Sequence, residues 1–124
     1  MVNALAVALG GALGATLRYA VAELVPQHVK ADFPYHTLLV NLTGAFLLGV
    51  VMTLAVEREA VSHWWRLFLG VGVLGGFTTF STLAFETVEL AREGAMVAAF
   101  ANAAGSLVAG LIAVMAGIYV GRLL

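Results

Sequence analysis

The chain has 124 residues, of which 62% are hydrophobic and only 10% are charged. Because a soluble domain carries about 25% charged residues, this composition argues against a soluble enzyme, a nucleic-acid-binding domain or a disordered chain and places the protein in a lipid bilayer. The net charge of −1 provides no basic stripe for a nucleic acid, and the lack of cysteine removes disulfides, thiol catalysis and thiolate metal sites.

Four apolar runs are long enough to cross a membrane, since a spanning helix needs about 20 mostly apolar residues. They cover about 2–25, 37–56, 65–87 and 95–120. Pro26 ends the first run, and the charged residues 57–59 close the second. We therefore predict an all-α integral membrane protein, with residues 1–124 forming a single four-span domain.

Lys and Arg are divided evenly between the two faces of the predicted bundle. The side of both termini and the middle loop holds Arg58, Arg66 and Arg122, and the other side holds Lys30, Arg92 and Arg18. Because an excess of Lys and Arg normally sets orientation, this tie predicts insertion in both directions and an antiparallel homodimer.

Small-residue pairs offer a way for helices to approach closely. The pairs are Gly10/Gly14, Gly72/Gly76 and Gly117/Gly121. Each pair could pack helices within one chain or between two copies. Together with the charge tie, the pairs favour a dimer.

Polar side chains at membrane depth are costly and often functional. The sequence predicts only neutral ones within the apolar zone: Thr16, Asn41, Thr43, Thr78, Thr79, Ser81, Thr82, Asn102 and Ser106. None of these can hold a proton near neutral pH, so we expect no embedded proton-coupling site. The histidines, His28, His36 and His63, are interpreted as solvated loop residues, and without a catalytic motif we expect no enzyme.

A track of hydrogen-bond donors remains. The amide of Asn41 and the hydroxyls within 78–82 could replace water around a small anion without a fixed charge that would trap it. Each Ser or Thr could equally bond the carbonyl four residues earlier in its own helix. Asn41 could equally join two helices.

The segment 75–82, Gly-Gly-Phe-Thr-Thr-Phe-Ser-Thr, is a poor helix interior, because each glycine costs about 1 kcal/mol relative to alanine. We predict a local break in the third span, and we expect Gly75 to be needed for its freedom in φ. Unwound backbone at membrane depth lines cavities, where free carbonyls coordinate cations and free N–H groups attract anions. The ring edges of Phe77 and Phe80 could favour an anion, although buried Phe usually only packs.

These segments resemble the Fluc, or CrcB, family of fluoride channels. The likeness spans the chain and includes Gly-Gly-Ala-Leu-Gly-Ala-Thr-Leu-Arg-Tyr at 10–19, Thr-Leu-Leu-Val-Asn-Leu-Thr-Gly-Ala-Phe-Leu-Leu-Gly at 37–49, the segment 75–82, and Asn102, Ser106, Gly110 and Gly117. The segment 75–82 is the most specific of these motifs.

The resemblance implies a dual-topology, antiparallel homodimer in a bacterial plasma membrane, which exports fluoride passively through two pathways. It also implies a structural sodium ion at the dimer centre, held by the backbone carbonyls of Gly75 and Thr78 in each copy. The residues that it places along the fluoride pathway are Asn41, Phe80, Thr37, Ser81, Thr82 and Ser106. Arg18 would give a positive vestibule.

Two positions depart from the family pattern. Leu83 stands where a second pore phenylalanine is usual, with the next ring at Phe85, and Asn102 stands where many members carry tyrosine. The alternative function is that of a small multidrug-type dual-topology transporter, which needs an embedded glutamate in its first helix. The first span has only Glu23, near its end. A third alternative, an accessory subunit, leaves the predicted break unexplained.

Overall fold

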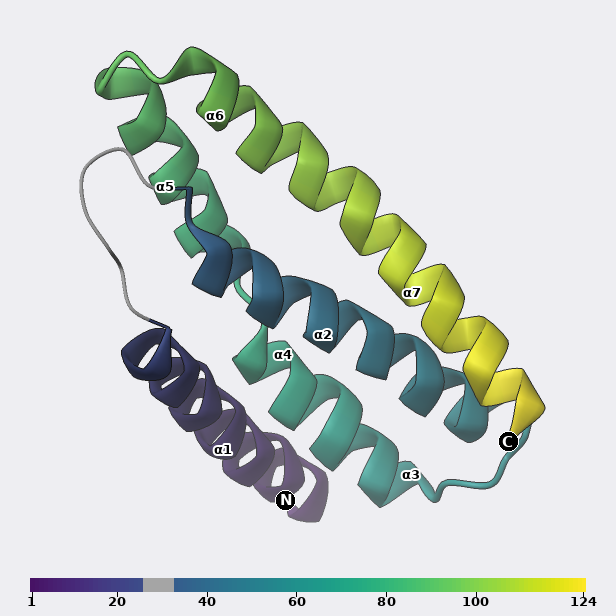
Figure 1. The fold of residues 1–124 in the computed structure, drawn as a ribbon. Helices are drawn as coiled ribbons and strands as arrows, with labels where there is room; N and C mark the ends of the chain where they lie inside the picture. Colours follow the sequence, from purple (N-terminus) through teal and green to yellow (C-terminus); the bar gives the residue numbers. More distant parts are fainter. Residues whose placement is uncertain (26–32) are drawn as a thin grey trace.

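All regular secondary structure is helical in the described residues, 1–25 and 33–124, of the computed structural model (Figure 1). Four helical stretches are long and apolar enough to cross a membrane: Val2–Leu24, Tyr35–Glu57, His63–Arg92 and Met96–Leu123. The prediction of four helices long and apolar enough to span a membrane is therefore confirmed, with ends that differ by a few residues. Lys30 and His28 lie outside the described residues.

The spans are built from shorter elements. They are α1 (Val2–Leu24); α2 (Tyr35–Met52) with the π-helical turn η1 (Thr53–Glu57); α3 (His63–Trp65), η2 (Arg66–Leu74), α4 (Gly75–Phe77) and α5 (Phe80–Arg92); and α6 (Met96–Phe100), η3 (Ala101–Gly105) and α7 (Ser106–Leu123).

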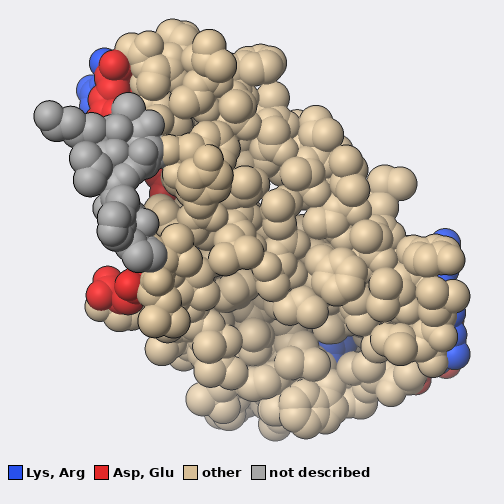
Figure 2. Space-filling model, viewed as in Figure 1, with Lys and Arg blue, Asp and Glu red and all other residues tan. Residues whose placement is uncertain are grey.

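Many large apolar side chains point outward, and on the face in Figure 2 the charged residues gather mainly at the two ends of the molecule. This distribution suits a protein surrounded by lipid.

The third span changes its packing partner halfway. Its first part, η2 and α4, packs along α1, whereas α5 packs against α6 and η3. The second span, α2, packs along α7 and lies between α7 and the η2–α4 segment (Figure 1). The two halves of the third span therefore belong to different helix contacts.

Glycines let the helices of one chain touch backbone to backbone. A Cβ added at Gly72 would lie 2.8 Å from the Cα of Gly10, and one added at Gly76 would lie 2.6 Å from the carbonyl oxygen of Gly11. Gly117 likewise lies against the backbone of α2. The small-residue pairs therefore pack within the chain, and they give no support to a dimer.

The change of partner occurs at two residues between α4 and α5. Thr78 (φ −78°, ψ 155°) and Thr79 (φ −148°, ψ 118°) are extended, a conformation that suits β-branched side chains. Gly75 has ordinary helical angles (φ −65°, ψ −37°), and the nearest atom to a Cβ added there is 3.9 Å away. The expectation that Gly75 is needed for its conformational freedom is therefore wrong, because the chain bends at the threonines.

Candidate functional site

Asn41 of α2 holds the extended backbone at Thr79. Its Nδ2 donates to the Thr79 carbonyl (3.0 Å), and its Oδ1 accepts from the Thr79 N–H (2.7 Å). One amide thus satisfies both backbone groups of a residue 38 positions away. The sequence left two roles open for Asn41, and this geometry supports the one that joins two helices. Its second amide proton has no acceptor among residues 1–25 and 33–124.

The Thr79 hydroxyl begins α5. It accepts from the Thr82 N–H (3.2 Å) as an N-cap and donates to the Thr82 hydroxyl (3.0 Å). The exposed Ser81 hydroxyl lies 3.3 Å from it. Thr78 behaves differently, because its hydroxyl donates to the Leu74 carbonyl four residues earlier (2.9 Å). The hydroxyl groups of the predicted track therefore gather at Thr79, and Thr78 does not contribute its own.

The same bonds leave two carbonyls without their usual helical donors. In a continuous helix the Gly75 carbonyl would accept from the Thr79 N–H, and the Thr78 carbonyl from the Thr82 N–H. Here the first N–H donates to Asn41 and the second to the Thr79 hydroxyl. Carbonyl oxygens are ligands that hard cations prefer, so the donor set at the break fits a cation such as sodium.

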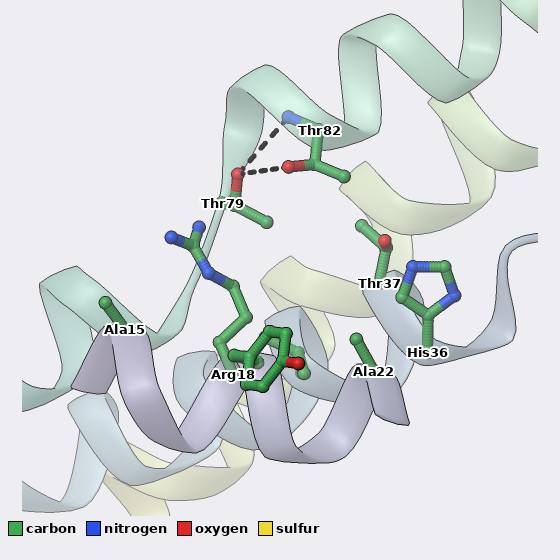
Figure 3. Close-up of a pocket in the computed structure, with 9 residues that line it drawn as sticks. Ala15, Arg18, Ala22, His36, Thr37, Thr79 and Thr82 are labelled. Carbon is green, nitrogen blue, oxygen red and sulfur yellow. Dashed lines mark hydrogen bonds between the residues drawn. The ribbon is translucent and has the colours of Figure 1, made fainter. Parts of the chain in front are cut away.

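A cavity of about 330 Å³ lies beside the break, between α1 and α2 (Figure 3). Its lining residues are Ala15, Arg18, Tyr19, Ala22, His36, Thr37, Val40, Thr79 and Thr82. The guanidinium of Arg18 extends from α1 toward Thr79 (Figure 3), so the cavity joins a fixed positive charge to the hydroxyls of the break.

Glu86 of α5 is a buried acid that the sequence interpretation missed. One oxygen, Oε1, accepts from the Thr37 hydroxyl (2.7 Å) and lies 3.2 Å from Nε2 of His36. Its side chain is 17% exposed, and Oε2 has no hydrogen-bond partner within the described part of the chain. The expectation of a zone without acidic groups is therefore wrong. The signal was present, because Thr82 and Glu86 lie four residues apart and so share one face of a helix.

His36 is also placed differently from the interpretation as a loop residue. It lies in the first turn of α2, and its side chain is only 16% exposed. His63, which begins α3, is exposed and lies near Arg66 and Asn3 at the other end of the bundle.

The remaining predicted residues lie away from the cavity. Ser106 is buried, as is Asn102, whose Nδ2 donates to the Thr87 hydroxyl (2.9 Å). Phe80 is 82% exposed on the single chain. The structure therefore gathers Arg18, Thr37 and Thr82 around one cavity, whereas Phe80 and Ser106 do not line it.

Comparisons with known proteins identify the family. Residues 5–118 match the family model described as CrcB-like protein, Camphor Resistance (CrcB). The chain belongs to the CrcB family. The resemblance found in the sequence is thereby confirmed, and its most specific motif, 75–82, is the segment that bends between α4 and α5.

Curated relatives cover almost the whole length of this CrcB chain, and three of them carry the name "Fluoride-specific ion channel FluC". A protein from Thermus thermophilus is 50% identical over 117 residues, which are 94% of this chain and 93% of the relative. One from a Geobacter species is 48% identical over 118 residues, 95% of each chain. One from Chloroflexus aurantiacus is 43% identical over 122 residues, 98% of this chain and 97% of the relative.

Proposed function

We propose that this multi-pass membrane protein is a fluoride-selective channel, which lets fluoride leave the cytoplasm passively across a bacterial plasma membrane. The observation that carries the proposal is the cavity at the helix break, where Arg18 and threonine hydroxyls meet in a chain of the CrcB family. Relatives that are 43–50% identical over nearly the whole chain are named as fluoride-specific channels, not as enzymes.

The hydrogen-bond donors in and beside the cavity support an anion as the permeant species. Arg18 presents guanidinium N–H groups and a permanent positive charge. The Thr79 hydroxyl proton is directed to the Thr82 oxygen, so the Thr82 proton is available to another acceptor. Asn41 does not line the cavity but is bonded to Thr79, which does, and its second amide proton has no acceptor among the described residues. These donors can replace the hydration shell of a compact anion, with Phe80, Ser81 and Ser106 continuing the pathway beyond the cavity.

The exposed polar groups support an antiparallel homodimer. Gly75, whose carbonyl has lost its helical donor, and Ser81 are both exposed on the single chain. Polar backbone facing lipid costs several kcal/mol per group, so a second copy is the natural cover for this surface. The balance of Lys and Arg gives neither orientation an advantage, as antiparallel pairing requires.

A structural sodium ion, which is not transported, is part of the proposal. The backbone carbonyls of Gly75 and Thr78 would hold it, and two copies would supply four oxygens. When bound, it supplies a positive charge that ties the two breaks together. The carbonyls are available because Asn41 and the Thr79 hydroxyl take the N–H groups that would otherwise bond them.

The deciding experiment is anion efflux from liposomes that contain only this protein. We expect a fluoride gradient to dissipate electrogenically, with chloride nearly excluded. Equal rates for the two anions would refute fluoride selectivity. Electroneutral flux linked to protons would instead favour the alternative, a small multidrug-type exchanger, in which Glu86 of the third span would have to replace the first-helix glutamate that such exchangers need.

A further inference from the structure

His36 of α2 and Glu86 of α5 lie next to each other beside the cavity. His36 lines the cavity, and its Nε2 lies 3.2 Å from Glu86 Oε1, the oxygen that also accepts from Thr37. Both side chains are more than four-fifths buried. This contact is therefore part of the packing between α2 and α5. It is not an ion pair between two solvent-exposed side chains.

Nε2 of His36 faces Glu86 Oε1 at 3.2 Å. This nitrogen carries a proton in the doubly protonated imidazole and in one of the two neutral tautomers. Protonation of the ring therefore adds one unit of positive charge at the cavity wall, next to the carboxylate.

The other charges near His36 are few within the described residues. Arg18 of α1 borders the same cavity, together with Tyr19, an uncharged phenol. Further along α5, Glu89 is paired with Arg92 (3.0 Å). With Glu86 ionised and His36 neutral, the charges of Arg18 and Glu86 cancel. With His36 protonated, the sum is +1.

We propose that His36 is a positioning residue for fluoride entry: its protonation offsets the charge of Glu86 and draws the anion into the cavity. The proposal rests on the fluoride-channel function proposed above. Protonation of His36 should lower the fluoride concentration at which flux is half-maximal. The reason is that it changes the charge at the cavity, which we take as the entrance for fluoride, and does not narrow the pathway. Fluoride flux should therefore rise as pH falls.

The test uses the full chain in liposomes with equal pH on both sides, varied between pH 5 and 8. Protein-free liposomes correct for hydrogen fluoride that crosses the lipid directly. At low fluoride we expect wild-type flux to increase on the order of tenfold from the alkaline to the acidic end, as expected for a change of local charge. At saturating fluoride the pH effect should largely disappear.

Two substitutions fix the charge of the entrance. His36→Gln keeps a donor for Glu86 but cannot be protonated, so its flux should stay at the alkaline wild-type level at every pH. His36→Lys is always charged and should stay at the acidic level. His63→Gln is the matched control, because His63 lies at the other end of the bundle, and it should keep the wild-type profile.

Several results would overturn the proposal. Wild-type fluoride flux that does not depend on pH would do so without any variant, as would a His36→Gln protein that keeps the wild-type profile. If both His36 variants lose flux at every pH while eluting as the wild type does, the residue is structural and the proposal fails. Absence of wild-type fluoride flux at every pH would instead refute the channel function itself.

Discussion

Replacement of Asn41 tests whether one amide maintains the helix break. Asn41→Leu preserves approximate volume but removes both hydrogen bonds to the Thr79 backbone. Each such bond contributes about 0.5–1.5 kcal/mol net, so the substitution should cost the bent conformation about 1–3 kcal/mol. Because a continuous helix can satisfy the Thr79 N–H through the Gly75 carbonyl, the equilibrium between bent and straight forms should shift roughly fivefold to 150-fold.

The assay for this prediction is fluoride efflux from liposomes, together with thermal unfolding in detergent. Flux should fall in proportion to the loss of the bent form. Asn41→Asp should also be impaired, although it stays polar and of similar size, because it sets a carboxylate oxygen against the Thr79 carbonyl. Thr16→Val is the matched control, since the Thr16 hydroxyl bonds only locally to the Ala12 carbonyl. Wild-type flux and stability in Asn41→Leu would refute this account of the break.

Three further predictions concern the cation, the orientation and the packing. Replacement of all sodium by a large organic cation should lower both flux and the unfolding temperature, because a bound ion stabilises the folded state by linkage; if neither changes, Gly75 and Thr78 are not cation ligands. Two or three lysines added to the loop at 58–62 should fix one orientation of the chain in the membrane. Fluoride flux should then be lost, and it should return on coexpression with a copy biased to the opposite orientation. Full flux of the biased form alone would exclude obligate antiparallel pairing. Gly44→Ala should reduce stability and flux, since its Cβ would overlap the Thr78 methyl at a cost of about 1–3 kcal/mol, whereas Gly11→Ala, whose Cβ meets nothing within 4 Å, should be tolerated.

The sequence could predict the spans and the place of the break. Long apolar runs are a strong signal, because the bilayer thickness imposes a minimum length. The segment 75–82 stood out because glycine and threonine weaken a helix. The exact position of the bend was not predictable from these propensities. It falls at Thr78 and Thr79, because the Asn41 amide, 38 residues away in the chain, replaces the helical bonds of Thr79.

The pairing of Glu86 with His36 could not be derived from helical periodicity. Periodicity predicts which residues share a face only while the helix continues. The two extended residues at 78–79 reset the helical phase, so the rotation of α5 relative to α2 depends on tertiary contacts. His36 also precedes the predicted start of the second span by one residue, whereas α2 begins at Tyr35. A side chain at such a boundary is easily assigned to solvent.

The helix break and the Glu86–His36 pair both depend on the contact between α2 and α5. Thr37 and Asn41 are one turn apart on α2, and they bond respectively to Glu86 and to Thr79 at the start of α5. Because the partners follow in reverse order along α5, the two links hold the helices antiparallel at two levels. The Asn41 link frees a backbone carbonyl for a cation, and the Thr37 link fixes the carboxylate beside His36. The position of one helix against the other thus determines both the carbonyl available to the proposed cation and the charge at the cavity wall.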